Sequence, residues 1–405
     1  MTRYHSRENT QLLLDALESM PVVVLSGLRQ SGKSTLLQHL PEKLGFVYKT
    51  FDDLNTREAA RLDPDAFLEQ GERMIIDEAQ RFPEIMNFVK KTVDLKRRNG
   101  RFILSGSSNF LLLKNISESL AGRAIYFELY PFNRREILKK VGGSSTFENF
   151  IRSGDFKKQT GQTISWQEII TGGMPSVCLK EVKKAEIWFK GYEQTYLERD
   201  IRMLSQVADL VAFGQLLRLT ALRTGQVLNQ SDLGRDAKLN AVTAGRYLSL
   251  METSFVISRL SPFLKNPASR LIKAPKIYFT DTGMAAYLCG ASKLDSQEPL
   301  KGRLFENYVF QNLRSILAAR LPDARIYYWN IQGRNEVDLI VEEGLKTYAI
   351  EIKYGSQWRS GDLKGLEAFM VGAKNCAASI LVYNGKEVAK ISDKIWVIPA
   401  SILLE

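Results

Sequence analysis

The sequence predicts an α/β protein: a parallel β-sheet with helices on both faces, then a helical middle and a second α/β domain. Strand-like runs alternate with helical segments in the first third, and this order is typical of a parallel sheet. Short amphipathic helices dominate the middle, and strand-like runs return near the C-terminus after a long helical pattern. The strand-like runs of the first third cover residues 22–26, 46–51, 73–77, 101–105 and 124–129.

The composition of the chain limits its partners and its chemistry. Its 405 residues are enough for several domains, and 25% charged with 44% hydrophobic residues is ordinary for globular proteins. The formal net charge of +11 favours a polyanion, so DNA is an expected partner, although charge alone does not establish it. His5 and His39 are the only histidines. A zinc cluster or a Ser-His-Asp triad is therefore nearly excluded, which leaves carboxylates, Lys, Arg and Mg²⁺ for catalysis.

Cysteine usage and hydropathy indicate where the protein works. Cys178, Cys289 and Cys376 are odd in number, far apart and without a CxxC spacing, which fits a reducing compartment. The N-terminus has no signal-peptide pattern, and no run approaches the roughly 18 apolar residues of a membrane span. We therefore expect a cytoplasmic protein with no membrane partner.

The strongest motif lies in PVVVLSGLRQSGKSTLLQHL, which matches G-x-x-x-x-G-K-[ST] directly after a strand-like run and before a helical pattern. Gly27 and Gly32 let backbone N–H groups close around phosphate. Lys33 can reach the outer phosphates, and the Ser34 hydroxyl can bind Mg²⁺. The motif predicts a P-loop NTPase that binds ATP and Mg²⁺. The residues expected to bind the nucleotide are Gly27, Arg29, Gln30, Ser31, Gly32, Lys33, Ser34, Thr35 and, further along the chain, Ser107.

A second strand-like run, RMIIDEAQ, ends in two acids. A nucleotide hydrolase needs such a pair beside the P-loop: Asp77 would bind Mg²⁺, and Glu78 would act on the attacking water. An acid pair at a strand end can also cap a helix, but its position after a P-loop favours the hydrolase. A small-molecule kinase is the competing class. Glu78 argues against it, because kinases place the acceptor hydroxyl where this residue would hold water.

Two further places could contribute to ATP hydrolysis. The run RFILSGSSN ends in small polar residues, of which Ser107, Ser108 or Asn109 could sense the terminal phosphate. Arg123 stands just before the last strand-like run, where an arginine finger could act on a neighbouring subunit of a homo-oligomer. The alternative is a solvent-exposed arginine without such a role.

The middle of the chain carries no catalytic motif. A polar, glycine-rich stretch at 142–162 indicates a connection or lid, and residues 206–263 read as short helices followed by a β segment, as in a winged helix-turn-helix. The candidate recognition helix runs from Ala241 to Met251, and Arg246 and Lys238 could face phosphate. Because basic residues are not concentrated there, a protein contact or a structural role is as consistent with the sequence as DNA reading.

The C-terminal hairpin pattern NEVDLIVEEGLKTYAIEIKYG carries charges where a half-buried strand favours Val or Ile. Period-2 alternation puts Glu351 and Lys353 on one face, and in a hairpin Asp338 can lie beside Glu351. Two carboxylates and an ammonium suit a divalent cation with an activated water. The alternative is an exposed face of an edge hairpin. Upstream, Glu306 lies near the start of a helical pattern, where the helix dipole alone would favour an acid.

The order of helix, strands, helix and strand around Glu306, Asp338 and the Glu351-Ile352-Lys353 stretch resembles the PD-(D/E)XK nuclease fold. The resemblance implies that Glu351 and Asp338 bind Mg²⁺, that Glu306 helps to orient the metal or its water, and that Lys353 stabilises hydroxide or developing phosphorane charge. It is equally compatible with an inert nucleic-acid platform, because the sequence does not reveal a blocked groove.

Several motifs occur in one order: GLRQSGKST, IDEAQ, SGSSN, SLAGR with a strand and YPF, GGMP, YLERDI and KIYFTDTGM. In this order they resemble prokaryotic AAA-type ATPases that carry a C-terminal domain of unknown function, over nearly the whole chain. The resemblance implies nucleotide and Mg²⁺ binding by Lys33 and Ser34, and hydrolysis by Asp77 and Glu78. It also implies a polar sensor near Ser107, and it matches Arg123 to the arginine of a GR pair that acts as a finger by analogy.

These observations predict a Mg²⁺-dependent ATPase coupled to DNA binding or processing through a nuclease-like domain. One alternative is an ATP-switched DNA- or protein-binding scaffold with an inactive nuclease-like fold. Another is a regulatory ATPase with a protein partner and no nucleic acid. The predicted division is 1–140 for the AAA-type ATPase domain, 141–205 for a helical lid or connector, 206–265 for the winged helix-turn-helix, 266–300 for a connector and 301–405 for the nuclease-like domain.

Overall fold

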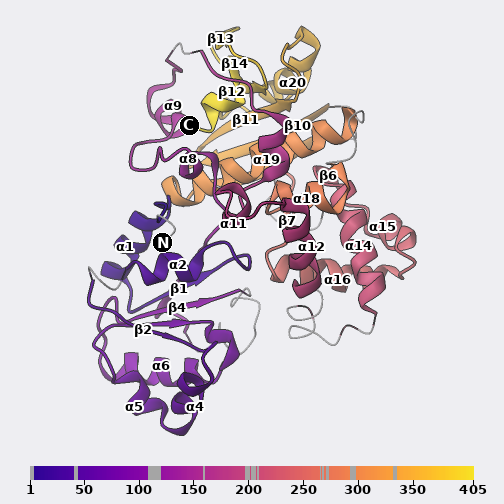
Figure 1. Cartoon of the computed structure of the whole chain (residues 1–405). Coiled ribbons are helices and arrows are strands. Elements are labelled where there is room, and N and C mark those ends of the chain that lie inside the picture. Colours follow the sequence, from indigo (N-terminus) through magenta and orange to yellow (C-terminus); the bar gives the residue numbers. More distant parts are fainter. Residues whose placement is uncertain are drawn as a thin grey trace. The chain divides into compact units, whose positions relative to one another are not determined.

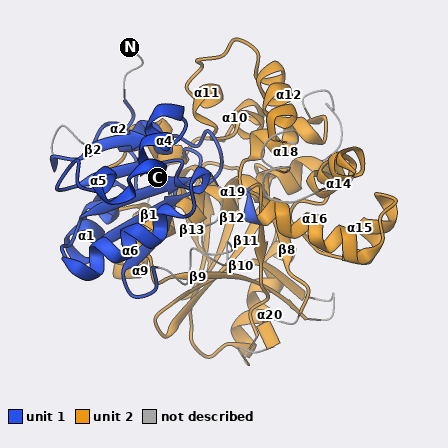
Figure 2. Ribbon diagram, turned by 90° about the horizontal axis from the view of Figure 1, so that it is seen from below, with its two compact units in different colours: residues 1–132, 253–255 blue, residues 133–252, 256–405 orange. Residues whose placement is uncertain are grey.

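The computed structural model divides into two compact units (Figure 2). Unit 1 comprises residues 1–132 with 253–255, and unit 2 comprises residues 133–252 with 256–405. Within the described part of the chain, no helix is long and apolar enough to cross a membrane. The structure describes residues 4–40, 44–107, 120–157, 160–196, 201, 207, 209–264, 266, 269–270, 273–291, 298–331 and 335–405.

Unit 1 is built on a parallel sheet, which confirms the architecture predicted from the alternation of strands and helices. Its strands are β1 (Val22–Ser26), β2 (Val47–Thr50), β3 (Met74–Asp77), β4 (Phe102–Gly106) and β5 (Ala124–Glu128). Among the described residues they pair in the order β2-β3-β4-β1-β5, and every pair is parallel. The carboxyl ends of the strands therefore meet at one edge, where the P-loop follows β1 and the acid pair ends β3.

Helices cover both faces of this sheet (Figure 1). They are α1 (Thr10–Ser19), α2 (Lys33–Gln38), α4 (Leu54–Leu62), α5 (Pro64–Leu68) and α6 (Ile85–Leu95). Side chains alternate between the two faces along a strand, so Val23 and Leu25 of β1 pack with α1 and α2. Val22 and Val24 pack on the opposite face with α4, α5 and α6. All four valine and leucine side chains are buried, as expected for a sheet covered on both sides.

The first part of unit 2 is helical and includes a small antiparallel sheet. Its helices are α8 (Arg134–Ile137), α9 (Thr146–Ser153), α10 (Trp166–Thr171), α11 (Pro175–Cys178), α12 (Ala185–Thr195), α14 (Leu210–Leu222), α15 (Gln230–Asp236), α16 (Ala241–Thr253) and α18 (Thr282–Leu288). The strands β6 (Gln226–Val227), β7 (Ile257–Leu260) and β8 (Lys276–Phe279) pair in the order β6-β8-β7. Helix α16 includes the residues of the candidate recognition helix. Strand β8 lies in the segment predicted to be a connector. The winged-helix assignment stays a prediction.

The C-terminal part of unit 2 combines a long helix with a mixed sheet. Its elements are α19 (Glu298–Arg320), β9 (Arg325–Ile331), β10 (Asn335–Glu343), β11 (Lys346–Lys353), η5 (Ser360–Leu363), α20 (Lys364–Gly372), β12 (Cys376–Tyr383), β13 (Ala389–Lys390), β14 (Ile395–Pro399) and α21 (Ala400–Leu403). The strand order is β13-β14-β12-β11-β10-β9 in the described residues. The predicted hairpin is present as the antiparallel pair β10 and β11, in which Leu339 lies opposite Ile350.

Side-chain hydrogen bonds join these two parts of unit 2. The amide of Asn307 in α19 pairs with both backbone groups of Phe279 in β8: the Phe279 N–H donates to Oδ1 at 2.8 Å, and Nδ2 donates to the carbonyl at 2.9 Å. The buried Asp281 carboxylate accepts from the backbone N–H groups of Gly173 at 2.6 Å and Met284 at 2.8 Å. The GGMP and TDTGM motifs are therefore bonded to each other through one side chain. The finer predicted division of this unit into separate segments stays a prediction.

Candidate functional site

The P-loop of unit 1 depends on glycine at two positions. Gly27 has φ of 147°, and a Cβ at this position would lie 2.4 Å from the carbonyl oxygen of Leu129. Gly32 has φ of 96° and immediately precedes α2, which begins at Lys33. Gln30 is also in the left-handed region, with φ of 60°. These conformations curl the loop between β1 and α2, as the motif predicts.

The ammonium group of Lys33 lies inside this loop. Its Nζ donates to the carbonyl oxygens of Gly27 at 2.9 Å and Leu28 at 3.0 Å, and the residue is 4% exposed. The Ser31 hydroxyl is buried and has no hydrogen-bond partner among the residues that the structure describes. The Thr35 carbonyl contacts Nδ1 of His39 at 2.8 Å. The structure thus gathers the predicted nucleotide-binding residues of the loop, Gly27, Arg29, Gln30, Ser31, Gly32, Lys33, Ser34 and Thr35, at the carboxyl end of β1.

Arg7 is a residue of this region that sequence reasoning missed. It is 3% exposed, and its Nη1 donates to the carbonyl oxygen of Ser31 in the P-loop at 2.8 Å. Its guanidinium lies 4.3 Å from the ring centroid of Phe132. The segment before α1 therefore supports the loop from outside the motif. No sequence signal marks this arginine, because the contact joins it to a backbone atom 24 residues away.

Asp77 is the last residue of β3. It is 2% exposed, and its carboxylate accepts hydrogen bonds. Its Oδ2 accepts from the Tyr48 hydroxyl at 2.6 Å, and its Oδ1 accepts from the Ser105 hydroxyl. Burial and then the Asp77 hydrogen bond raise the pKa of Tyr48 above its ordinary range, while a hydrogen bond with Ser34 opposes this shift. The Tyr48 hydroxyl thus contacts both residues that the sequence predicts as Mg²⁺ ligands in this unit, Ser34 and Asp77.

Glu78 follows Asp77 in a left-handed conformation, with φ of 53°. Burial raises the pKa of its carboxyl, the Lys33 charge opposes this shift, and the Asp77 charge adds to it. Gln80 donates its amide hydrogens to Glu78 and, at 3.4 Å, to the Ser107 hydroxyl. The predicted water-activating acid and the predicted sensor are therefore linked through Gln80. The other candidate sensors, Ser108 and Asn109, lie outside the described residues.

Arg123 lies at the opposite edge of the sheet from the P-loop. It precedes Ala124, which is paired with Val22 at the start of β1. Its Nε donates to Oδ1 of Asp94 at 2.6 Å, and its Nη2 donates to Oδ2 at 2.9 Å. The predicted finger is thus held by a two-point ion pair on its own unit, and its action on a neighbouring subunit stays a prediction.

Lys276 of β8 lies at the centre of a carboxylate cluster in unit 2. Its Nζ is 2.5 Å from Oε1 of Glu336, 3.1 Å from Oδ1 of Asp338 and 3.2 Å from Oε1 of Glu306. The Tyr278 hydroxyl also donates to Oε1 of Glu306, at 2.6 Å. Burial lowers the pKa of the Lys276 ammonium, but the nearby acids, Glu306 foremost, raise it well above its ordinary value. Lys276 carries no predicted role, although a lysine at the start of the apolar run KIYF is a visible signal.

Glu351 and Lys353 lie beside this cluster on β11. Nζ of Lys353 donates to Oε1 of Glu351 at 2.6 Å, and Oε2 of Glu351 is buried without a partner. The N–H of Ile352 donates to Oδ2 of Asp338 at 2.9 Å, so the two strands of the hairpin are joined at the predicted position. Burial and then the Asp338 charge raise the pKa of Glu351 to about 8, and the same two causes raise that of Glu306 to about 7.

The cluster does not fit a divalent metal ion as it stands. In the described ranges, no group of three or more His, Cys, Asp or Glu side chains is arranged to hold one. The Lys276 ammonium occupies the point toward which Glu306 and Asp338 direct their oxygens. The structure therefore brings the predicted acids Glu306, Asp338 and Glu351 into one neighbourhood, but around an ammonium. Their predicted role as metal ligands is not favoured by this geometry.

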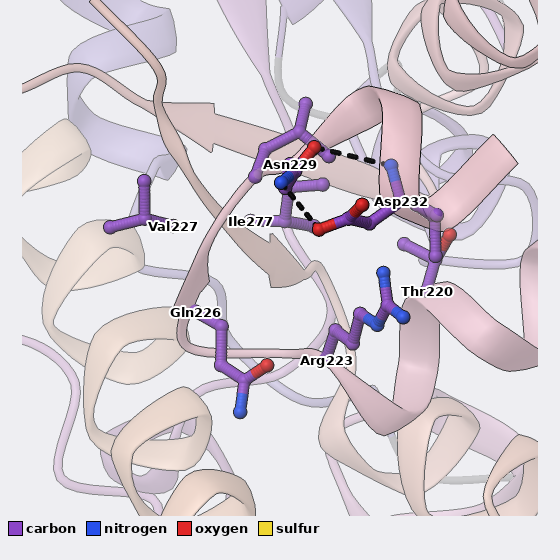
Figure 3. Close-up of a pocket in the computed structure, with 9 residues that line it drawn as sticks. Thr220, Arg223, Gln226, Val227, Asn229, Asp232 and Ile277 are labelled. Carbon is purple, nitrogen blue, oxygen red and sulfur yellow. Dashed lines mark hydrogen bonds between the residues drawn. The ribbon is translucent and has the colours of Figure 1, made fainter. Parts of the chain in front are cut away.

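A hollow of about 210 Å³ lies elsewhere in unit 2, between α14, β6 and α15 (Figure 3). Most of its polar side chains are already paired. Nδ2 of Asn229 donates to Asp232 at 2.5 Å, the Asp232 N–H donates back at 3.2 Å, and Arg223 forms an ion pair with Asp236. These bonds cap α15 and fix the adjacent helix. The side chains that line the hollow therefore serve the structure, and we assign no ligand to it.

Comparison with known proteins agrees with the geometry of unit 1. A family model described as an AAA domain matches residues 19–138. Two domains of unknown function, DUF8612 and DUF4143, match residues 163–295 and 301–403. An uncharacterized protein of Mycobacterium tuberculosis is 31% identical over 403 residues, covering 98% of this chain and 84% of the relative. The chain therefore belongs to the family of AAA-type P-loop ATPases that carry a C-terminal DUF4143 domain.

The chain also has more distant relatives outside the genus Mycobacterium. An uncharacterized protein of Methanocaldococcus jannaschii is 23% identical over 402 residues, covering 92% of this chain and 84% of the relative. Among solved structures, the Walker-type ATPase PABY2304 of Pyrococcus abyssi is 16% identical with a TM-score of 0.39, covering 71% of this chain and 99% of that one. This structural likeness is too weak to support an argument about function.

Proposed function

We propose that unit 1 binds ATP with Mg²⁺ and hydrolyses the ATP. The observation that carries the proposal is that the P-loop follows β1 and the acid pair Asp77 and Glu78 ends β3, at the carboxyl edge of one parallel sheet. This arrangement supports a site in which Lys33 binds phosphate and Glu78 acts on water. ATP hydrolysis needs both groups, because catalysis of phosphoryl transfer rests on positioning and charge stabilisation.

Each residue of the site has a role in this proposal. Lys33 exchanges its two carbonyl partners for the outer phosphates, and the backbone of the loop surrounds them. Ser34 and Asp77 hold Mg²⁺: both offer oxygen atoms, and both already contact one hydroxyl, that of Tyr48. When bound, Mg²⁺ neutralises charge that develops on the phosphates. Glu78 orients water, with Gln80 and Ser107 beside it.

The test is phosphate release from ATP by the purified full chain, with Mg²⁺ and with Mg²⁺ removed by a chelator. We expect turnover that depends on Mg²⁺, and we expect Asp77→Asn to abolish it. Turnover that persists unchanged after removal of all divalent ions would contradict the proposal.

A second candidate function is the coupling of ATP turnover to DNA binding or processing through unit 2. Its support is the net charge of +11 and the order of helix and strands that resembles a nuclease-like fold. The alternative is an ATP-switched scaffold for DNA or protein with an inactive nuclease-like fold, and the ion pairs of Lys276 favour it. Labelled single-stranded, duplex and branched DNA, each with and without ATP, distinguishes a DNA-binding protein from one that binds no nucleic acid.

We further propose a homo-oligomer in which Arg123 acts on the nucleotide site of a neighbouring subunit. The position of Arg123 at the edge away from its own P-loop supports action in trans. A cytoplasmic location is proposed as well, since Cys178, Cys289 and Cys376 are free thiols.

A further inference from the structure

We infer that Lys276 fills the cation position of the C-terminal carboxylate cluster, so that this domain carries a built-in ammonium in place of a divalent metal ion. A lysine ammonium has three hydrogen-bond donors. The three carboxylates around Nζ, those of Glu336, Asp338 and Glu306, lie within 2.5 to 3.2 Å and come from two different elements. One protein cation thus takes the position of a metal ion and offsets part of the negative charge of the three carboxylates.

The protein holds this lysine in place on both sides. Its side chain is 2% exposed. In β8, the neighbouring Ile277 pairs with Gln226 of β6 and Arg259 of β7, and Phe279 is fixed by Asn307. A metal ion could enter only by forcing the ammonium out of the cluster, because two cations about 3 to 4 Å apart in a buried site repel each other strongly.

Protein donors other than Lys276 also reach several oxygen atoms of the cluster and of the neighbouring Glu351. Oδ2 of Asp338 accepts from the Ile352 N–H, Oε1 of Glu306 accepts from the Tyr278 hydroxyl, and Oε1 of Glu351 accepts from Lys353. A metal ion would have to replace these bonds as well as the three made by Lys276. In this geometry an ammonium already occupies the cation position, and we expect unit 2 to act without metal-dependent cutting.

The inference goes beyond ATP hydrolysis and concerns unit 2 alone. Its test measures the binding of Mn²⁺ to nucleotide-free full-length protein. Electron paramagnetic resonance of the free ion gives the amount bound. We expect the parent protein and Asp338→Asn to bind Mn²⁺ equally. Lys276→Met removes the charge at similar length, and we expect it to gain a Mn²⁺ site on the order of 10²-fold tighter than any in the parent. This gain should vanish in the double variant Lys276→Met/Asp338→Asn.

Lys276→Arg is the matched control, because it keeps a cation in the cluster, and we expect no gain of Mn²⁺ binding. Mn²⁺ binding by the parent that is lost in Asp338→Asn would overturn the inference, as would Lys276→Met that folds but gains no site. If Lys276→Met does not fold, the comparison of the parent with Asp338→Asn still decides. Phosphate release from ATP by the same samples reports on unit 1 separately, so failure of the ATPase proposal is distinguishable from failure here.

Discussion

Tyr48 donates its hydroxyl hydrogen to Oδ2 of Asp77 at 2.6 Å, which joins β2 to the carboxylate at the end of β3. An interaction with Ser34, the other residue proposed to hold Mg²⁺, lowers the pKa of the same hydroxyl. The contact with Asp77 occupies one oxygen atom of the carboxylate that would hold Mg²⁺. We therefore expect Tyr48 to compete with the metal ion for Asp77.

Replacing Tyr48 by Phe should lower the Mg²⁺ concentration needed for half-maximal ATP turnover. A hydrogen bond to a charged group is worth about 1.5 to 3 kcal/mol, so the expected shift is on the order of tenfold. Mg²⁺ titrations of ATP turnover measure it. Tyr126→Phe is the control, because that hydroxyl is buried on the same sheet without a partner. A higher Mg²⁺ requirement in Tyr48→Phe would show that the tyrosine positions Asp77 for the metal instead of competing with it.

Replacing Lys33 by Ala should weaken ATP binding. The ammonium is the charged group that the P-loop offers to phosphate, and losing one charge-assisted contact corresponds to on the order of 10²-fold in affinity. Binding of a fluorescent ATP analogue measures the change. Lys91→Ala removes an exposed ammonium that pairs with Asp65 in the same unit, and it should bind ATP as the parent does. Equal affinities of the two variants would remove Lys33 from the nucleotide site.

Replacing Arg123 by Ala should reduce ATP turnover on the order of 10³-fold with little change in ATP affinity, if the arginine acts as a finger in trans. Mixing this variant with Lys33→Ala should restore part of the turnover, because mixed neighbours form intact sites. Arg98→Ala breaks an exposed ion pair with Glu72 and serves as the control. Turnover that is independent of protein concentration, with no rescue on mixing, would assign Arg123 to its ion pair with Asp94 alone.

Asp281 should make the stability of unit 2 depend on pH. Burial raises the pKa of its carboxyl from 3.8 to about 6, although backbone N–H groups oppose the shift. The folded state holds the Asp281 proton more tightly than the unfolded state does. The stabilisation that this proton gives to the folded state is therefore fully present below pH 4 and is lost as the pH rises through 6. The loss is on the order of 2 to 3 kcal/mol in the free energy of unfolding.

Chemical denaturation at pH values from 4 to 7 measures this dependence. In Asp281→Asn the free energy of unfolding should fall less over the same range, whatever its absolute stability. Asp209→Asn changes an exposed cap of α14 and should keep the slope of the parent. Parallel pH profiles for the parent and Asp281→Asn would contradict the assignment.

The sequence predicts those parts of the molecule that depend on local pattern. The parallel sheet follows from alternating strands and helices, and Gly27, Lys33, Asp77 and Glu78 belong to motifs whose spacing fixes their places. The hairpin that pairs Asp338 with the strand of Glu351 follows from period-2 alternation.

The missed residues act through tertiary contacts. Lys276 meets Asp338 across 62 residues, and Tyr48 meets Asp77 across 29. Lys276 begins the motif KIYFTDTGM, but nothing in that motif identifies Asp338 as its partner, and Tyr48 stands in no motif. Nothing local in the sequence states that an ammonium would occupy the centre of the predicted metal site.

The central claim, that unit 1 hydrolyses ATP through Glu78, is tested most directly by comparing ATP binding and phosphate release in the parent and in Glu78→Gln. The change keeps the side-chain volume and removes the carboxylate that acts on water. The account predicts that Glu78→Gln binds ATP with the affinity of the parent, while phosphate release falls on the order of 10²-fold or more. Phosphate release at the rate of the parent, or loss of ATP binding in the variant, would contradict it.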